Sequence, residues 1–304
     1  MFHVKHFITM KKLTACPVCD NSSTKPHLEC IDYMKSREVF TLEKCNHCQF
    51  IFTNPRPEEG RLGEYYKFED YISHSDTKEV LISKCYHIVR SWNIKQKVKL
   101  LGKEKGTVLE IGSGTGKLLA KCKEVGWKTI GIEPSLEARK IAKETNHIEL
   151  IENINTVKEK KNSIDRVMLW HVLEHIPNID EVFVKINLLL KDDGKLIIAV
   201  PNSKAYDAEK YQENWAGYDV PRHLSHFQKT TFKRIADKHS FEITKIKPMW
   251  FDAFYTSLLS EKIKTGKYNY IKGFSTGLRS NIKAVVGKGE FSSLIFILEK
   301  KRAK

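Results

Sequence analysis

Long apolar runs are missing from this chain of 304 residues. Nothing approaches the roughly 18 uninterrupted apolar residues that a membrane-spanning helix needs, so the sequence predicts no span. Residues 1–12 mix basic and apolar side chains but lack an apolar h-region and a small-residue cleavage site, which argues against a secretory signal. Met10, followed by two lysines, is a second candidate initiator beside Met1.

Motifs of nucleic-acid-binding proteins are also missing, although the net charge is +15. The chain has no Arg-Gly-Gly run, no RNP motif and no base-reading helix. More than half of the positive excess lies in residues 261–304, where eleven Lys and Arg stand against three Glu. Two interpretations remain open for this basic C-terminal tail: a solvated surface, or contact with an anionic membrane surface or RNA.

The seven cysteines are an odd number, which fits a reducing cytoplasm better than a disulfide scaffold, and we expect a cytoplasmic protein. Four of them form two Cys-x-x-Cys pairs roughly 25 residues apart, a spacing typical of a zinc ribbon. These predicted ligands of a structural Zn²⁺ are Cys16, Cys19, Cys45 and Cys48. Disulfides or unrelated thiols are the alternative. Cys30 has no partner at ligand spacing, and His47 is not needed because four thiolates complete a tetrahedron.

Three segments follow from the pattern of apolar residues. Residues 13–58 form a zinc-ribbon-like module, residues 59–104 a helical connector or lid, and residues 105–304 a larger domain with an insertion at 202–230. The connector has an apolar stripe at helical spacing after a cluster of aromatic residues. The stripe consists of Leu81, Ile82, Cys85, Ile88, Val89 and Trp92, and the cluster of Tyr65, Tyr66, Phe68 and Tyr71.

The third segment alternates short apolar runs with amphipathic helices. Strands are predicted at 107–111, 128–132, 147–151, 166–170 and 195–200, and helices at 118–125, 136–144 and 180–190. This order predicts an α/β fold with a parallel, doubly wound sheet and helices on both faces. Such sheets bind ligands at the carboxyl ends of their strands.

A glycine-rich loop, Gly112-Ser113-Gly114-Thr115-Gly116, directly follows the first of these strands and opens a helix. Glu133 stands about 20 residues further on, at the end of the second strand, where a carboxylate can bind two ribose hydroxyls. No lysine follows the glycines in a P-loop arrangement, which argues against an NTPase. Nicotinamide dinucleotides and other ribosyl cofactors remain open at this point.

Four motifs in this segment resemble the successive motifs of class I S-adenosylmethionine-dependent methyltransferases. They occupy residues 108–116, 131–135, 165–175 and 188–198, in the order typical of that family. The resemblance implies a Rossmann-like, seven-stranded sheet whose last strand is antiparallel. Residues 241–247 and 293–298 would be the final two strands.

The resemblance also implies roles for particular residues. The amino-acid end of S-adenosylmethionine would be held by Glu110, Gly112, Ser113, Gly114 and Gly116. Glu133 would bind the ribose, while Trp170 and His171 would line the methionine side. Core packing is the alternative for Trp170.

The ribbon and this core together resemble a zinc-ribbon group of bacterial methyltransferases that includes sugar C-methyltransferases. In those sugar enzymes a His-x-x-Tyr-Phe segment supplies the base, and the nearest match here is His223-Leu224-Ser225-His226-Phe227. His223 takes the base position and His226 replaces the tyrosine; His171 is a third candidate. Either insertion histidine could instead cap the helix expected at 230–239, and Arg222 could pair with an acceptor phosphate or carboxylate. The chain is also too short for the further C-terminal domain of the sugar enzymes.

The leading hypothesis is methyl transfer from S-adenosylmethionine to a small-molecule or glycan acceptor. The expected acceptor is a hydroxyl, or a carbon, of a sugar or lipid-linked saccharide, with a histidine as general base. Alternatives are an RNA methyltransferase and a non-catalytic cofactor-binding scaffold. An Asn/Asp-Pro-Pro-Tyr tetrad for N-methylation is missing after the fourth strand, where residues 170–173 read Trp-His-Val-Leu. The ribbon is expected to line the acceptor side.

Overall fold

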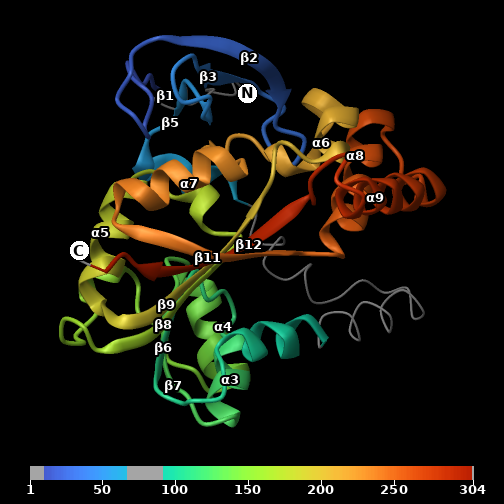
Figure 1. The fold of residues 1–304 in the computed structure, drawn as a ribbon. Helices are drawn as coiled ribbons and strands as arrows, with labels where there is room; N and C mark the ends of the chain where they lie inside the picture. Colours follow the sequence, from blue (N-terminus) through green and yellow to red (C-terminus); the bar gives the residue numbers. More distant parts are fainter. Residues whose placement is uncertain (1–9, 67–91, 303–304) are drawn as a thin grey trace, which may run out of the picture.

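The computed structural model describes residues 10–66 and 92–302. Its central sheet has the strand order β11-β12-β9-β8-β6-β7. The strands are β6 (Thr107–Ile111), β7 (Lys128–Ile132), β8 (Ile164–Trp170), β9 (Leu190–Pro201), β11 (Phe241–Pro248) and β12 (Ser293–Lys300). The β6–β9 strands pair in parallel, whereas β12 is antiparallel to both of its neighbours. The predicted Rossmann-like sheet with an antiparallel last strand is confirmed (Figure 1).

Within the described residues, the sheet has six strands rather than the expected seven. Residues 147–151, predicted as a strand, contribute a single parallel bridge between Ile151 and Ile132. The reason is the preceding helix, α4 (Leu136–Asn146): His147 adopts a left-handed conformation as its C-cap, and the Ile148 amide donates to the Ala142 carbonyl. Only the end of the segment is left to pair with the sheet.

Alternate residues of the strands enter two separate cores, as both faces of a covered sheet require. One core joins Leu109 and Val167 to Phe183 of α5 (Ile179–Leu189) and Phe232 of α7 (Lys229–Lys238). The opposite core joins the alternate strand residues to α3 (Lys117–Glu124) and to the helix at 92–100. Figure 1 shows α5 and α7 on one side and α3 on the other.

A second sheet, in the N-terminal module, has the order β10-β4-β3-β2 and is antiparallel. Its strands are β2 (Thr24–Ile31), β3 (Val39–Cys45), β4 (Ile51–Thr53) and β10 (Ser225–His226). A small pair joins β1 (Met10–Lys11) to β5 (Arg56–Pro57), and η1 (Glu59–Tyr65) follows. Because β10 comes from the enzyme segment, the ribbon shares a sheet with residues next to His223.

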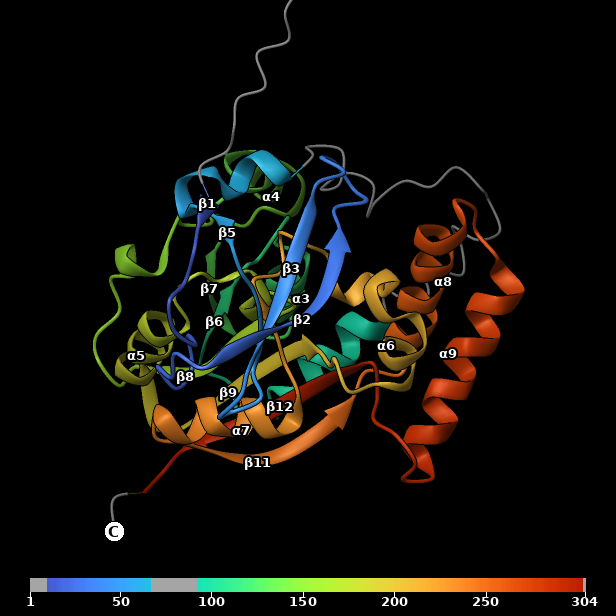
Figure 2. The same cartoon turned by 90° about the horizontal axis from the view of Figure 1, so that it is seen from above.

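Short helices complete the connections: η2 (Ile154–Thr156), η3 (Leu173–His175), α6 (Tyr206–Tyr211), η4 (Gln212–Asn214) and η5 (Ala216–Tyr218). Between β11 and β12 the chain forms a helical hairpin of α8 (Asp252–Thr265) and α9 (Tyr270–Val285). The hairpin stands at one side of the molecule in both views, with α9 outermost (Figures 1 and 2). The basic segment is therefore not a tail, since it contains α9 and β12.

Part of the predicted connector can be compared with the structure. Trp92 lies in the helix at 92–100, while Phe68, Tyr71 and the apolar stripe from Leu81 to Val89 lie outside the described residues. Within 10–66 and 92–302, no helix is long and apolar enough to cross a membrane. The proposed boundaries at 13–58, 59–104 and 105–304 stay predictions.

Candidate functional site

The glycine loop connects the end of β6 to α3, as its sequence predicts. Gly112, Gly114 and Gly116 all have left-handed backbone angles, with φ of 73°, 52° and 74°. Gly112 has a second constraint, because a Cβ there would lie 2.2 Å from Cγ2 of Val172. Any side chain at Gly112 would therefore push the loop away from the end of β8.

Glu133, at the end of β7, is buried and holds this loop in place. Its Oε2 accepts a hydrogen bond from the Gly114 amide at 2.8 Å, and its Oε1 accepts one from the Ser135 amide at 3.0 Å. The loop and the carboxylate expected to bind ribose thus form one hydrogen-bonded unit.

Glu110 lies beneath the loop and is buried, and its Oε2 has no hydrogen-bond partner within the described parts of the chain. Burial raises the pKa of its carboxyl to about 8; nearby Lys97 opposes the shift and Glu133 adds to it. An unsatisfied buried carboxyl is costly. A cationic ligand group would remove that cost, so this position suits an ammonium.

Trp170, the last residue of β8, is buried and borders the same region. Among the residues that the structure describes, its Nε1 has no hydrogen-bond acceptor. The Lys97 ammonium, from the helix at 92–100, lies 4.4 Å from the centroid of its ring. Trp170 is thus part of a core and also presents an unpaired donor at the strand end.

His171 follows β8 with a left-handed φ of 54°. Its Nε2 lies 3.1 Å from Oδ2 of Asp252, and its Nδ1 lies 3.5 Å from Oε1 of Glu174. Burial lowers the pKa of the imidazole, but the two carboxylates outweigh burial and raise it to about 9. His171 therefore carries a positive charge at neutral pH.

Glu174, His175 and His223 form a compact cluster, in which one donor atom from each lies within 4.8 Å of the others. The carboxylate of Glu174 is fully buried, and neither oxygen has a hydrogen-bond partner in the described residues. The two imidazole rings meet edge to face, with centroids 4.6 Å apart. The cluster lies beside His171, which shares Glu174 with it.

A backbone carbonyl fixes the tautomer of neutral His223. Its Nδ1 is 2.8 Å from the Gly217 carbonyl oxygen, which only accepts, so Nδ1 donates and Nε2 keeps its lone pair. The Nδ1 of His175 lies 3.1 Å from the Arg222 carbonyl oxygen and 2.9 Å from the Tyr66 hydroxyl. Burial and the nearby His223 lower the pKa of His175 to about 4, against the effect of Glu174, so that ring is neutral.

His226 has a different environment from His171 and His223. It lies in β10 opposite Ile51, is buried, and has Nε2 3.2 Å from the Thr53 hydroxyl. Burial, with His223 adding to it, lowers its pKa well below the usual value. The structure thus brings together two of the three histidine candidates and places the third in the contact with the ribbon.

Arg222 is engaged within the protein rather than directed at an acceptor. Its guanidinium pairs with Asp32 at 2.9 Å and with Asp219 at 2.7 Å, and donates to the Tyr65 carbonyl at 3.0 Å. The carboxylates of Asp32 and Asp219 already use these donors, so the geometry does not favour a pairing with an acceptor phosphate or carboxylate, which stays a prediction. The ion pair instead joins the end of the ribbon's β2 to the insertion.

The four clip cysteines converge although they come from two distant turns. All are free thiols, with Sγ–Sγ distances of 3.5 Å for Cys16–Cys48 and 3.6 Å for Cys19–Cys45. A disulfide needs about 2.05 Å, so the disulfide alternative is excluded. The four sulfurs lie within 4.8 Å of one another, a set that suits a tetrahedral Zn²⁺.

Both clips use the same local turn. Asp20 and Gln49 follow the second cysteine of their pairs and have left-handed φ values of 57° and 65°. Their amides each donate at 3.0 Å to the carbonyl of the first cysteine, Cys16 or Cys45. The turn directs both thiols of a pair to one side.

Several residues of the site were not predicted from the sequence. Glu174 and His175 belong to the motif at 165–175, and their closeness to His171 in sequence was a usable signal. Asp252 and Lys97 come from elements outside the motifs, so only the tertiary structure places them.

Comparison with known proteins agrees with this geometry. Residues 88–246 match the family model described as a methyltransferase domain. An uncharacterized methyltransferase of Alkaliphilus oremlandii is 32% identical over 114 residues, which is 36% of this chain and 51% of that protein. One from Bacillus mycoides is 35% identical over 115 residues, 36% of this chain and 54% of its own length. The chain thus spans about half the length of these relatives.

Solved structures show the same fold at low sequence identity. A geranyl diphosphate C-methyltransferase from Streptomyces coelicolor has a TM-score of 0.51 at 12% identity, covering 80% of this chain and 88% of that one. A chain of the complex between the Haloferax volcanii Trm112 methyltransferase activator and a putative methyltransferase has a TM-score of 0.51 at 13% identity, covering 69% and 89%. With the family model matched across more than half of its residues, the chain belongs to the methyltransferase-domain family and has the class I S-adenosylmethionine-dependent methyltransferase fold.

Proposed function

We propose that this protein transfers a methyl group from S-adenosylmethionine to a hydroxyl, or a carbon, of a sugar or lipid-linked saccharide. The observation that carries the proposal is a pair of buried carboxyls at neighbouring strand ends: among the described residues, Oε2 of Glu110 has no hydrogen-bond partner, and the Glu174 carboxylate has only the ion pair with His171 at 3.5 Å. Glu110 lies under the glycine loop, and Glu174 lies among histidines after β8. Glu110 suits a cationic group of the cofactor. Glu174 suits a site where a histidine takes a proton from the acceptor.

The cofactor site would use the backbone of the glycine loop and the two carboxylates beside it. Glu110 would pair with the ammonium of the methionine part, and Glu133 would bind the ribose hydroxyls. The loop would contribute Gly112, Ser113, Gly114 and Gly116, with Trp170 and His171 on the methionine side. When bound, the cofactor supplies an electrophilic methyl group on a sulfonium.

His223 would act as general base for the acceptor. Its Nε2 keeps a lone pair, and the bond to the Gly217 carbonyl fixes its ring. Buried Glu174 nearby would stabilise the imidazolium that forms when a proton is taken up. His171, already protonated beside Asp252, suits a positioning role better than that of a base.

The ribbon would hold this base in position, with a structural Zn²⁺ bound by Cys16, Cys19, Cys45 and Cys48. Thr53 of β4 donates through its hydroxyl to the His223 carbonyl at 2.7 Å, and its amide donates to the Leu224 carbonyl at 3.1 Å. The ribbon therefore supports the backbone on both sides of the His223–Leu224 peptide bond.

The proposal is tested by transfer of tritiated methyl groups from S-adenosylmethionine into fractionated bacterial extracts. We expect label in saccharide or lipid-linked saccharide fractions, with His223→Gln lowering the rate by roughly 10²–10⁴-fold. Exposed His27→Gln, outside both cysteine clips, is the matched control. Label confined to RNA would support an RNA methyltransferase, and cofactor binding without any transfer would support a scaffold.

Repeating the assay with EDTA distinguishes a histidine base from a bound metal ion in the cluster of Glu174, His175 and His223. Two imidazoles and a carboxylate are also donors that a divalent cation accepts. Transfer that EDTA leaves unchanged supports His223 as base. Transfer that is lost and then restored by Mg²⁺ or Mn²⁺ would assign the cluster to metal binding.

A further inference from the structure

In the α8–α9 hairpin, α9 has its polarity reversed relative to a helix on the surface of a water-soluble domain. Such helices normally bury an apolar stripe and expose polar residues. Here the buried residues are small or polar: Ala253, Ser257, Ser260 and Glu261 in α8, and Gly273, Thr276, Gly277, Ser280 and Asn281 in α9. The apolar side chains of α9 must therefore lie elsewhere.

Small residues and hydrogen bonds hold the hairpin to the protein. A Cβ at Gly277 would lie 2.7 Å from the Cα of Phe254, so the two helices meet through their backbones. Ser280 donates to Oδ1 of buried Asp207 at 2.7 Å, and Tyr211 donates to Oε1 of Glu261 at 2.9 Å. These contacts fix the inner face through small and polar residues. Of the apolar side chains of α9, Phe274 adds a stacking contact with Phe254 of α8, with ring centroids 5.0 Å apart.

Those side chains form a stripe on the outer face of α9. The stripe consists of Ile271, Phe274, Leu278, Ile282 and Val285, which are 84%, 61%, 44%, 53% and 62% exposed. Their spacing of three or four residues places them on one side of the helix. With α9 the outermost element in Figures 1 and 2, these exposures show that the described residues leave this side of the helix uncovered.

The formal charge that borders the stripe is positive. Between residues 252 and 285 the basic residues are Lys262, Lys264, Lys267, Lys272, Arg279 and Lys283. The two acidic residues of this range are turned inward: Asp252 pairs with His171, and Glu261 is buried against Tyr211. Arg279 and Lys283 lie over the Tyr206 ring of α6, and Lys262 lies over the Tyr268 ring of the turn. The hairpin thus carries a positive formal charge beside its apolar stripe.

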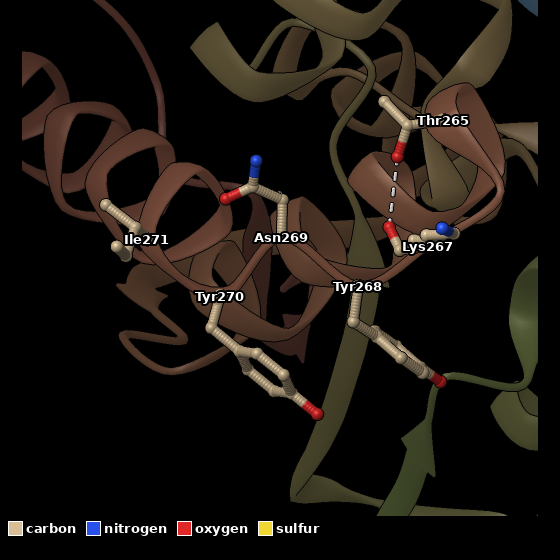
Figure 3. A pocket seen from close by; sticks show the side chains of 6 residues that line it. All are labelled: Thr265, Lys267, Tyr268, Asn269, Tyr270 and Ile271. Carbon is tan, nitrogen blue, oxygen red and sulfur yellow. Dashed lines mark hydrogen bonds between the residues drawn. The ribbon is translucent and has the colours of Figure 1, made fainter.

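The turn between the two helices adds aromatic residues to this face. Tyr268 and Tyr270 stack with ring centroids 5.9 Å apart and point to the same side of the turn, as Figure 3 shows. They border a surface hollow of about 470 Å³, none of whose lining residues belongs to the glycine loop or the histidine cluster. Tyrosine beside lysine is typical of a membrane–water interface.

We propose that the α8–α9 hairpin binds the surface of an anionic lipid membrane. The stripe would enter the boundary between headgroups and acyl chains, and the lysines and arginine would meet anionic headgroups. Charge complementarity favours lipid, because an RNA would use the cations but leave the apolar stripe in water. Neither helix is long and apolar enough to span the bilayer, so the hairpin would lie along it.

The hairpin also connects to the proposed acceptor site. Asp252, the first residue of α8, pairs with His171 beside the Glu174 cluster. A hairpin held at a membrane would therefore place the acceptor side near lipid, which favours a lipid-linked acceptor. This consequence rests on the proposed function, whereas membrane binding itself does not.

Co-sedimentation with vesicles tests the proposal on the full chain. Wild type should sediment with phosphatidylcholine vesicles that contain a quarter phosphatidylglycerol, and much less with pure phosphatidylcholine. The double variant Ile271→Ser, Phe274→Ser should bind at least about tenfold more weakly, since two apolar side chains leave the interface. Val184→Ser, at a 61% exposed valine of α5, is the matched control and should bind as wild type does.

Other outcomes would overturn the proposal. Equal binding by wild type and the double variant, or no binding to any vesicle, would contradict it. A double variant that changes only the oligomeric state would make the stripe a contact between copies, and binding to RNA that ignores the double substitution would assign the cations to RNA. S-adenosylmethionine binding by each variant reports folding, so loss of membrane binding is distinguishable from failure of the proposed function.

Discussion

Glu110 presents a buried carboxyl whose protonation and ligand binding are linked. With its pKa raised to about 8, mainly by burial, it holds a proton at neutral pH that a bound ammonium would displace. Each pH unit below 8 should then weaken cofactor binding by up to about tenfold. The affinity should rise between pH 6 and pH 7.5, a range in which most of the cofactor's ammonium stays charged.

Calorimetric titration of S-adenosylmethionine at several pH values measures this pH dependence of the cofactor affinity. Glu110→Gln should bind weakly and with a flat pH profile, while exposed Glu104→Gln should behave as wild type. A flat profile for wild type would show that Glu110 does not meet the ammonium.

His171 gives a prediction for stability. Its pKa is raised from 6.5 to about 9, because Asp252 and Glu174 outweigh burial. The folded state therefore holds this proton more tightly than the unfolded chain, so the stabilisation is complete below about pH 6.5 and is lost as the pH rises through about 9. The difference in Tm between wild type and His171→Gln should shrink from pH 6 to pH 10. A difference that grows across this range would contradict the assignment.

At the scale of elements, Arg222 connects the ribbon to the insertion through a buried ion pair. Removing one partner from such a pair leaves a buried charge unpaired and costs about 3–5 kcal/mol. Arg222→Met should lower the free energy of unfolding by that amount, measured in urea. Arg61→Ala, which breaks an exposed pair with Glu64, should cost no more than about 1 kcal/mol. Similar losses of unfolding free energy in both variants would show that the buried Arg222 pair contributes no more to stability than the exposed Arg61 pair.

The strands of the central sheet were predictable because buried parallel strands are short apolar runs bounded by turns. The runs at 107–111 and 128–132 match β6 and β7 residue for residue. The prediction of a strand at 147–151 was wrong because His147 caps α4 instead. The α8–α9 hairpin was not predicted, since its apolar residues face outward and its glycines face inward, the reverse of the usual pattern.

The site residues that belong to sequence motifs could be predicted. Those that come together from distant elements could not. The glycine loop and the convergence of the cysteines follow from local spacing. His226 could not be separated from His223 by sequence, because only the pairing of β10 with β4 shows that it contacts Thr53. Likewise, the buried partners of Arg222 come from positions 32 and 219.

At the scale of the whole molecule, the ribbon and the methyltransferase domain act as one structure through β10 and β4. If Zn²⁺ holds the clips, removing it should loosen β4 and Thr53, and with them the backbone of His223. We predict that chelation lowers acceptor affinity more than cofactor affinity, because the glycine loop has no contact of this kind with β4. Titrations of both ligands before and after chelation, with restoration by added Zn²⁺, measure this. Equal losses would show that the metal only holds the fold together.

Cofactor binding at the glycine loop is the central claim, and a calorimetric titration of S-adenosylmethionine tests it most directly. Wild type should bind one cofactor per chain. Gly112→Val should abolish binding, since a side chain there meets Val172 and the backbone is left-handed, while its circular dichroism spectrum stays that of the folded protein. A folded wild type that takes up no cofactor, or a folded Gly112→Val that binds as tightly as wild type, would contradict the account.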